Sequence, residues 1–584
     1  MATKAIPLET ASPPQQTTRW GSLFTQENFV TSLAAVFVAA AVFLPLIALI
    51  VSSFQVQDEL GFSATWGLGN YKLMVEHAPL REAFFNTIAI ATGATVLSTI
   101  VGVSLAWLNA RTNCPWRETL EPFNLIPYFL SPFVGAIAWH NLASPEVGLL
   151  NNFARWFFGI EEHIFNVDNI WGVIWVTAIF HAPLVYLFVV GSLRRMDPSL
   201  EDSARTTGAG LLRTTLTVTL PLVAPGILAG MIICFVTSAG EFGVPFKLGA
   251  PYGYQTYTTE IFTFAIGDDA NYQMGAAMSM VLGLITAVLI WVQRRITQKR
   301  EYTTVTGKGF RPNIIDLGRW KWAALGYNLA YLFIGVVLPL VTLVIVSLHK
   351  VWQGFPQPSK MTLENYEQLL FFWSPRSIEA ATNGIHNSFI LAFSGATIAM
   401  ILAVAMSFMI HRTKGVGSRL LDYLSVIPIG FPGIVLAMGV LIAFIKTPIY
   451  ATLWILLLGY ITRFFPYGQR NVSAVLLSVS EELDQSSRMS GASWLTTLRR
   501  ITIPLLKPGI FAGWVLLFII FLRELPISII LYTAGTETLS VGIYYLQEFE
   551  NEALTCTLSV IQCVILLVCV YIFRKLAGKE ALTA

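Results

Sequence analysis

Two glutamates in apolar segments are the first candidates for chemistry in this sequence. Glu241 stands in the segment EFGVP and Glu524 in RELP, 283 positions further along the chain. A carboxylate in or near hydrocarbon is costly and usually has a partner or a function. The pair could line a path for a cationic cargo, near helix breaks at Pro245 and Pro526. Alternatively, Glu524 pairs with Arg523 or with another helix, and Glu241 caps a helix end.

The remaining reactive side chains form no enzyme motif. His140 and His181 lie at or within apolar segments, and we expect hydrogen-bonded interior histidines rather than metal ligands. The five cysteines have no metal-ligand or redox spacing, and the four in apolar segments should act as small apolar residues. The sequence contains no HExxH or GxSxG pattern. An intramembrane enzyme is therefore the least favoured class, and whether the chain binds a metal stays open.

A polar stretch that occurs twice organises the chain. Residues 200–227 read LEDSARTTGAGLLRTTLTVTLPLVAPGI, and residues 483–510 read LDQSSRMSGASWLTTLRRITIPLLKPGI. Glycines, prolines and an arginine keep one offset of 283 positions without a gap, which indicates an internal repeat. Weaker matches extend the repeat to Asn70-Tyr71 and Asn365-Tyr366, to Asn86 and Asn387, and to Arg111-Thr112 and Arg412-Thr413.

Each copy of this stretch should form two short helices joined at a glycine. Acidic residues stand near the start of the first helix, where the helix dipole favours negative charge. Gly208 or Gly491 then ends the helix, because glycine makes this turn at little cost. Such an elbow could dock in a groove of a partner protein. A single copy could equally be a solvated amphipathic loop on the membrane surface, but two copies in register favour a shared docking role.

Composition identifies an all-α integral membrane protein. Of the 584 residues, 55% are hydrophobic and 12% are charged, whereas soluble domains have roughly 25% charged residues. Apolar runs long enough to cross a bilayer predict about twelve transmembrane helices, six in each half. The predicted spans are 30–53, 84–110, 123–143, 170–192, 222–244 and 275–293, then 323–348, 385–410, 422–445, 450–469, 508–531 and 556–574.

Lysine and arginine residues predict the orientation in the membrane. If the N-terminus is cytoplasmic, all but nine of the 37 basic residues fall on the cytoplasmic side. Arg463 is one of the residues predicted to be cytoplasmic. The nine exceptions are Lys72, Arg81, Arg155, Lys247, Lys350, Lys360, Arg376, Lys446 and Arg523. Both termini and both elbows are therefore predicted to be cytoplasmic. The basic residues form no continuous patch, so no nucleic-acid partner is expected.

The two halves should have the same orientation, because each contains an even number of spans. This arrangement is a parallel repeat, related by an axis along the membrane normal. We expect a first six-helix half at residues 1–296 and a second at 322–584. The polar, basic segment 297–321 between them is predicted to be a cytoplasmic linker.

The repeated stretch resembles the EAA motif of the permeases of binding-protein-dependent ABC importers, EAA-x3-G-x9-I-x-LP. In the first copy the pattern is filled by Asp202-Ser203-Ala204, Gly208, Val218, Leu220 and Pro221. In the second copy it is filled by Gln485-Ser486-Ser487, Gly491, Ile501, Ile503 and Pro504. The acidic and small residues are only partly kept. The resemblance covers essentially the whole chain, and it implies two fused permease halves with the type I ABC importer fold.

In that family the short helix before the glycine docks in a cleft of a cytoplasmic ATPase subunit. The resemblance implies two such ATP-binding subunits and assigns coupling contacts to both elbows. The implied contact residues are Glu201, Asp202, Ser203, Ala204, Arg205 and Gly208, and Asp484, Gln485, Ser486, Ser487, Arg488 and Gly491. A periplasmic or extracellular substrate-binding protein and a bacterial inner-membrane location are also implied. The chain itself should hold no cofactor, since ATP and magnesium would bind the partner and residues 306–309 are too short for a phosphate-binding loop.

The cargo is less clearly indicated than the class of protein. The fused layout and the EFGVP and RELP segments resemble the ferric-iron importer permeases, and also the thiamine, polyamine and phosphonate branches. We expect ferric iron, because two acids fit a cationic cargo such as Fe(III), although an anion carried with a metal would also fit. The competing class is an ion-coupled secondary transporter, which also has twelve spans in two parallel halves. Co-purification with a nucleotide-hydrolysing subunit would separate these two classes.

Overall fold

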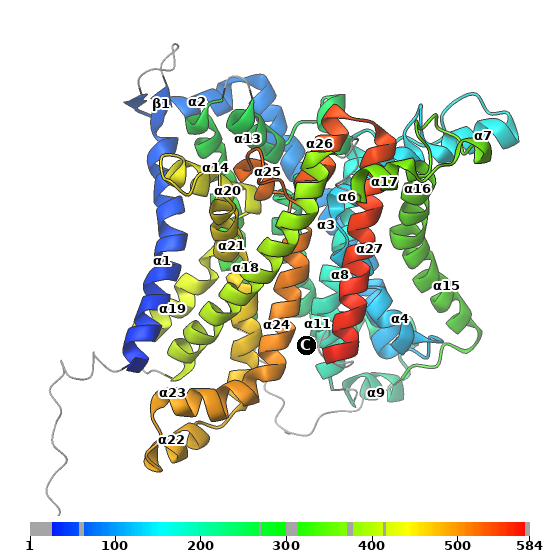
Figure 1. Cartoon of the computed structure of the whole chain (residues 1–584). Helices are drawn as coiled ribbons and strands as arrows, with labels where there is room; N and C mark the ends of the chain where they lie inside the picture. The colour runs from blue at the N-terminus through cyan, green and yellow to red at the C-terminus, as the bar shows by residue number, and fades with distance from the viewer. Residues whose placement is uncertain are drawn as a thin grey trace, which may run out of the picture.

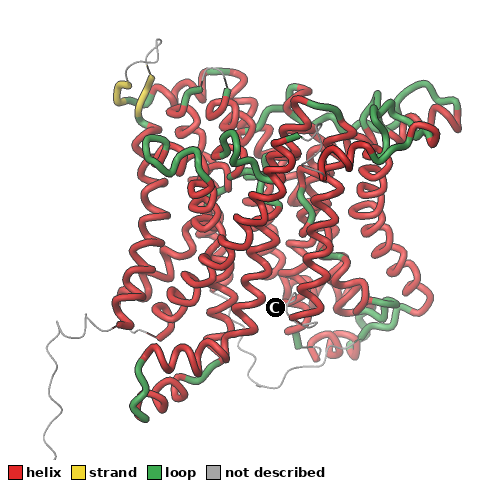
Figure 2. The backbone as a smooth tube through the Cα atoms, viewed as in Figure 1, coloured by secondary structure: helices red, strands yellow, loops and turns green. Residues whose placement is uncertain are grey.

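The computed structural model of the chain is a bundle of long helices (Figure 1). It describes residues 26–57, 64–197, 199–267, 270–298, 314–370, 378–412 and 416–577. Within these ranges one small sheet forms, from the antiparallel strands β1 (Gln55–Gln57) and β2 (Ala64–Trp66). Helices dominate because a backbone in lipid must satisfy its own hydrogen bonds (Figure 2). The predicted all-α membrane class is confirmed.

The two halves contain equivalent helices in the same order. The long helices of the first half are α1 (Gln26–Ser53), α3 (Ala78–Arg111), α8 (Ile170–Arg195), α11 (Leu220–Ala239) and α14 (Tyr272–Gln298). Those of the second half are α15 (Lys321–Leu332), which continues through η5 (Phe333–Val337) into α16 (Leu338–Ser347), then α18 (Glu379–Arg412), α21 (Leu453–Ser478), α24 (Ile503–Leu522) and α27 (Glu552–Ala577). Helices α3 and α18 each have 34 residues, and α8 and α21 each have 26. These equal lengths confirm the internal repeat.

Fewer uninterrupted crossings form than the twelve predicted, in the part of the chain that the structure describes. Nine single helices are long and apolar enough to cross a membrane, and one bent pair could form a tenth crossing. The predicted span 123–143 is broken into α4 (Arg117–Phe123), α5 (Ile126–Phe129) and α6 (Pro132–Ala143). Its counterpart 422–445 is the bent pair, in which the segments Ser418–Gly430 and Gly433–Phe444 (α20) meet at 106°.

Prolines account for the broken third span of each half. Pro127 and Pro132 stand in the first, and Pro428 and Pro432 stand at nearly the same places in the second. Proline lacks a backbone donor and disfavours helical geometry in the residue before it, so a helix ends there. The other departure is α21, which covers the predicted span 450–469 as a continuous helix but is not apolar enough to count as a crossing.

The first helix of each half packs against the other half. Helix α1 lies against α18 and α20 of the second half, and α16 lies against α6 of the first. The Thr462 hydroxyl donates to the carbonyl of Ala41 over 3.3 Å, and the Tyr331 hydroxyl donates to the carbonyl of Ile179 over 3.2 Å. Ile179 and Thr462 are themselves equivalent in the repeat. The halves are therefore interlocked. Their predicted boundaries stay a prediction, since much of the linker lies outside the described residues.

A repeated Asn-Tyr pair ties a short helix to the end of each first long helix. Asn70 of α2 (Gly69–Glu76) donates to the carbonyl of Ser53 over 3.1 Å, and Asn365 of α17 (Glu364–Leu370) donates to that of Ser347 over 2.9 Å. This contact explains why the sequence repeats Asn-Tyr in both halves. Both short helices lie at one end of the bundle (Figure 1).

Candidate coupling and translocation sites

Both repeated stretches fold as helix–glycine–helix elbows. In the first, α9 (Ser199–Thr206) and α10 (Leu211–Thr214) flank Gly208, whose φ is +87°. In the second, α22 (Glu481–Met489) and α23 (Trp494–Thr497) flank Gly491, whose φ is +86°. Among the described residues, no heavy atom lies within 4 Å of a Cβ placed on either glycine. The left-handed backbone therefore requires glycine here, and crowding does not.

Each elbow continues through one turn of π-helix into the helix of the fifth predicted span of its half, called the fifth helix below. This turn is η2 (Thr215–Thr219) before α11 and η8 (Leu498–Thr502) before α24. Single π turns are rare and frequently stand at functional sites. Figure 1 shows α9 and α22 at the same end of the bundle, opposite α2, α13 (Tyr257–Ile266) and α26 (Leu539–Phe549). The two halves thus have the same orientation, as predicted.

A buried ion pair holds the first elbow against the bundle. Arg111, the last residue of α3, pairs with Glu201 of α9, and their side chains are 0% and 3% exposed. The Thr219 hydroxyl of η2 donates to Oε1 of the same carboxylate over 2.6 Å. Three elements thus meet at one carboxylate. We call this contact the elbow clamp.

The second half contains an equivalent elbow clamp. Arg412, the last residue of α18, lies with its Nε 3.4 Å from Oδ2 of Asp484 in α22. The Thr502 hydroxyl of η8 donates to Oδ1 of Asp484 over 2.9 Å. Arg412 also lies 3.4 Å from Glu481 and donates to the carbonyl of Val479 over 2.8 Å. The repeated Arg-Thr match between residues 111 and 412 marked this position, but the sequence did not reveal its partner.

The elbow clamps change the role of two residues predicted to contact a partner. Glu201 and Asp484 are buried, so their carboxylates bind the bundle and not the surface of another protein. The reason is electrostatic: Glu201 pairs with the buried Arg111, and Asp484 pairs with the partly buried Arg412. The other predicted contact residues stay candidates. Exposed ones are Asp202, Ser203, Gly208, Gln485, Ser486 and Gly491, half-buried ones are Ala204, Arg205 and Ser487, and the side chain of Arg488 lies outside the described residues.

Glu241 and Glu524 cap breaks at the ends of the fifth helices. The predicted spans 222–244 and 508–531 stop early, at Ala239 and Leu522. Glu241 Oε1 then accepts from the Gly243 amide at 3.1 Å, and Glu524 Oε1 accepts from the Ile527 amide at 2.9 Å. These bonds begin α12 (Gly243–Leu248) and α25 (Ser528–Leu531). The geometry favours the structural interpretation of both acids over an open cation path.

The two histidines have hydrogen-bond partners inside the protein, as expected. His181 Nδ1 lies 2.8 Å from the Ser238 hydroxyl, and its Nε2 lies 3.9 Å from Glu241. His140 Nδ1 lies 2.9 Å from Asp168 in the loop before α8. Burial opposes ionisation of Asp168, but the hydrogen bond and charge of His140 outweigh it and lower the pKa of this carboxyl. No group of three metal-ligating side chains occurs among the residues that the structure describes.

Two arginines that were predicted to lie at opposite membrane faces, Arg463 at the cytoplasmic face and Arg523 at the other, lie instead beside the breaks in the third and fifth spans. Arg523 follows α24, donates to the carbonyl of Leu130 over 2.9 Å and stands 5.1 Å from the ring centre of Tyr128. Arg463 lies within α21 and donates to the carbonyl of Pro428. The two acceptors belong to the broken third spans of the two halves. Hydropathy could not locate these residues, because it assigns each basic residue to the nearest end of an apolar span and does not detect breaks within the span.

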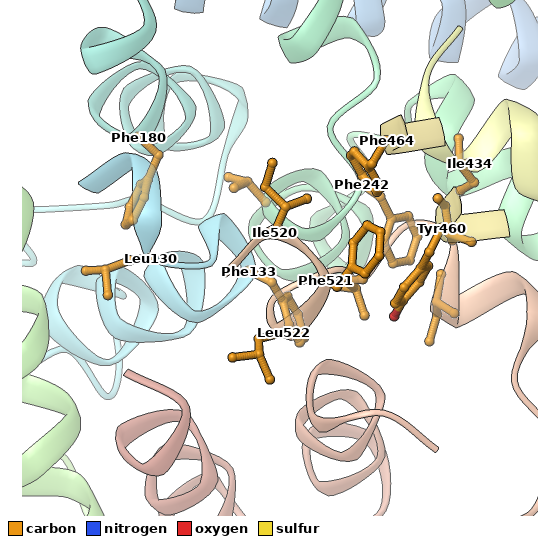
Figure 3. Close-up of a cluster of buried hydrophobic side chains, with 14 of the residues drawn as sticks. Leu130, Phe133, Phe180, Phe242, Ile434, Tyr460, Phe464, Ile520, Phe521 and Leu522 are labelled. Atoms are coloured by element: carbon orange, nitrogen blue, oxygen red, sulfur yellow. The ribbon is translucent and has the colours of Figure 1, made fainter. Parts of the chain in front are cut away.

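The helix breaks of the two halves pack closely against one another through apolar side chains. A Cβ on Gly240 would stand 2.7 Å from Pro432, and one on Gly243 would stand 2.6 Å from Phe133. Figure 3 shows Phe133, Phe242 and Phe521 in the buried cluster at this place. The fifth-helix break of the first half thus contacts both third spans. We call the region in which these helix breaks pack together the central constriction.

A family of known proteins matches both halves of this chain. The model described as "Binding-protein-dependent transport system inner membrane component" matches residues 84–302 and again residues 395–578. Each match contains one elbow and the fifth helix that follows it. The duplication found in the structure therefore coincides with two copies of one family domain.

Individual proteins that match this chain have low sequence identity to it. The ferric transport system permease protein FbpB of Actinobacillus pleuropneumoniae is 22% identical over 496 residues, covering 84% of this chain and 71% of that protein. The Fe(3+)-transport system permease protein FbpB 2 of Haemophilus influenzae is 22% identical, covering 80% and 84%. The sulfate transport system permease protein CysT of Salmonella typhimurium is 25% identical, covering 48% and 96%. A solved alginate ABC transporter, in complex with a periplasmic protein that binds an alginate pentasaccharide, has a chain that is 18% identical with a TM-score of 0.40, covering 48% and 99%.

Proposed function

Because this chain belongs to the family of inner membrane components of binding-protein-dependent transport systems, we propose that it forms the translocation path of an ATP-driven importer of ferric iron. The chain is a multi-pass permease of the type I ABC importer class and carries both permease halves in one polypeptide. This family membership replaces the ion-coupled secondary transporter as an interpretation of the twelve-span pattern. The permease is not itself an enzyme, and ATP hydrolysis belongs to a separate cytoplasmic subunit.

The two elbows are the observation that carries this function. They are exposed at one end of the bundle, have the same glycine turn and are held by the same clamp. Two equivalent docking elements imply two copies of an ATP-binding subunit, one on each half. The exposed side chains of α9 and α22 would contact these subunits, with ATP and magnesium bound there. This end of the bundle and both termini would then face the cytoplasm.

The elbow clamps suggest how a movement of the ATPase subunits reaches the membrane. Each elbow is fixed to the end of α3 or α18 by its clamp and runs into α11 or α24 through the π turn. Closure of two ATPase subunits around ATP would draw the elbows together. Since α11 and α24 end at the central breaks, this movement would shift the constriction and give alternating access.

Ferric iron is the proposed cargo because of the relatives that span both halves. Two permeases named for ferric or Fe(3+) transport match at least 80% of this chain. A binding protein outside the inner membrane would deliver iron to the opposite end of the bundle, where α2, α13 and α26 lie. A second candidate is an oxyanion or phosphonate. Arg463 and Arg523 at the constriction favour it, and a sulfate permease is a relative of one half.

Reconstitution tests the proposed function directly. The permease, co-purified with its own ATPase and binding protein, is placed in liposomes, and uptake of 55Fe(III) is followed. We expect uptake that needs ATP and the binding protein and that excess sulfate does not displace. Uphill uptake by the permease alone, without nucleotide or a companion subunit, would refute the importer mechanism. ATP-dependent uptake of sulfate or phosphonate in place of iron would refute only the cargo.

A further inference from the structure

Two guanidinium groups lie at the central constriction. Arg523 belongs to the break after α24, and Arg463 belongs to α21. Arg523 stands 5.1 Å from the ring centre of Tyr128 and donates to the carbonyl of Leu130, and Arg463 donates to the carbonyl of Pro428 in the matching break of the other half. Both charges also act electrostatically on the phenol of Tyr128 and on the carboxylate of Glu524. Both side chains are half-buried, so part of each remains accessible.

Neither guanidinium is neutralised by a direct ion pair. In the described part of the chain, no carboxylate lies within 4 Å of the nitrogens of Arg463 or Arg523, although other lysines and arginines form ion pairs there. Each arginine donates to one backbone carbonyl. A guanidinium has five N–H donors, so most donors of each group remain for a ligand.

The neighbouring carboxylates already accept hydrogen bonds from the backbone. Glu241 and Glu524 each accept from the backbone amide that starts the next short helix. They lie close enough to Arg523 to interact with it electrostatically, but at a greater distance than an ion pair. They moderate the positive charge of the region without covering the donors.

The repeat shows that the guanidiniums are not needed to build the break. The positions in the first half that correspond to Arg463 and Arg523 are Phe180 and Gly240. The first half nevertheless forms the same break, with Glu241 capping α12 as Glu524 caps the start of the next turn. Both arginines therefore belong to one half only, which is unexpected for a purely structural element of a duplicated fold.

We propose that Arg463 and Arg523, together with Tyr128, form an anion site in the translocation path, and that cargo passes the constriction as an anionic species. Arginine binds carboxylate, phosphate and other oxyanions through paired, charge-assisted hydrogen bonds. The inference rests on the proposed import function. For iron it means that Fe(III) crosses bound to anionic oxygen ligands, because two guanidiniums would repel the bare trivalent ion.

The test uses the reconstituted complex of permease, ATPase and binding protein with 55Fe(III). We expect R463Q and R523Q each to lower iron uptake at least tenfold, while the ATPase activity stimulated by the binding protein stays within about twofold. The matched control is R470Q, which changes another arginine of α21 whose partner is Asp422, and it should import at the wild-type rate. A smaller fall in R463Q or R523Q overturns the proposal. Loss of ATPase stimulation together with import also overturns it, since that places the arginines in coupling or folding.

A second measurement asks for the charge that accompanies the cargo. Wild-type complex on a solid-supported membrane should move no net positive charge for each iron imported, and three positive charges per iron would overturn the anion site. If the wild type imports no iron, the ferric proposal fails, and the same variants are assayed with 35S-sulfate and 33P-phosphate. Import of either anion that both glutamine variants lose then supports the site. Import of neither anion overturns it.

Discussion

Arg111 and Glu201 are almost completely buried, so each side chain depends on the other for the stability of its charge. Removing one member of such a pair leaves an uncompensated buried charge and costs about 3–5 kcal/mol. The equivalent Arg412 has more partners, because Glu481 and the carbonyl of Val479 also lie beside its guanidinium. The two elbow clamps should therefore differ in their sensitivity to mutation.

We expect Glu201→Gln to lower the free energy of unfolding by about 3–5 kcal/mol, because Arg111 loses its only carboxylate in the described structure. Asp484→Asn should cost less, about 1.5–3 kcal/mol, since Arg412 keeps two partners. Chemical unfolding in detergent measures both values. Adding Arg111→Met to Glu201→Gln removes the unpaired guanidinium and should recover part of the loss. Equal unfolding of the wild type and Glu201→Gln would contradict the clamp.

The capping role of Glu241 and Glu524 gives a prediction that separates the two interpretations of these acids. Glutamine keeps an oxygen that accepts from the Gly243 or Ile527 amide but carries no charge. We therefore expect Glu241→Gln and Glu524→Gln to retain at least half of the transport rate. Replacement by leucine removes the acceptor, costs about 1–3 kcal/mol for the unpaired amide and should lower transport strongly.

Uptake assays on the four variants decide between the roles. If glutamine abolishes transport as completely as leucine does, the charge itself is needed and the acids line the path. Protein yield and ATPase stimulation serve as the control for folding in each variant.

The elbow is the element that we propose docks with the ATPase subunit, and one glycine sets its shape. At a φ near +87° a β-branched side chain is strained, whereas asparagine tolerates the left-handed region. The space around Gly208 and Gly491 is open, so any effect of substitution comes from the backbone. A substitution at either glycine should thus alter the elbow without crowding the bundle.

We expect Gly208→Val or Gly491→Val to cost about 1–3 kcal/mol locally and to abolish transport-coupled ATP hydrolysis, while membrane insertion stays normal. Gly208→Asn and Gly491→Asn are the matched controls and should retain most of the coupling. The ATPase activity with and without the binding protein measures the effect. Normal coupling in both valine variants would refute the docking role of the elbows.

Local signals predicted the elements well where one residue type decides the conformation. The glycine turns, the repeat and the breaks near Pro245 and Pro526 could all be read from the sequence. The break of the span 123–143 was missed, because hydropathy sums over a window and ignores the prolines within it. The elbow clamp was missed because Arg111 and Glu201 are 90 positions apart, and no periodic pattern connects them.

At the scale of the whole molecule, the chain is one interlocked body rather than two adjacent halves. Helix α1 belongs to the first half by sequence but packs on α20 of the second, and α16 makes the corresponding exchange. The repeated motifs and the hydropathy pattern predict two halves and their order, but they do not reveal this exchange, since hydropathy carries no information on which helices touch. Through this exchange each half braces the other.

The contact between α1 and α20 can be tested through one glycine. A Cβ on Gly439 of α20 would stand 2.7 Å from the carbonyl oxygen of Pro45 and 3.0 Å from Leu49, both in α1. Gly439→Leu should therefore separate α1 from the second half. We expect co-expressed halves, residues 1–296 and 322–584, to co-purify through a tag on one half, and Gly439→Leu to lower the recovered partner at least fivefold. Gly326→Leu in α15, where no described atom lies within 4 Å, should leave recovery unchanged. Equal recovery with Gly439→Leu would mean that α1 does not hold the halves together.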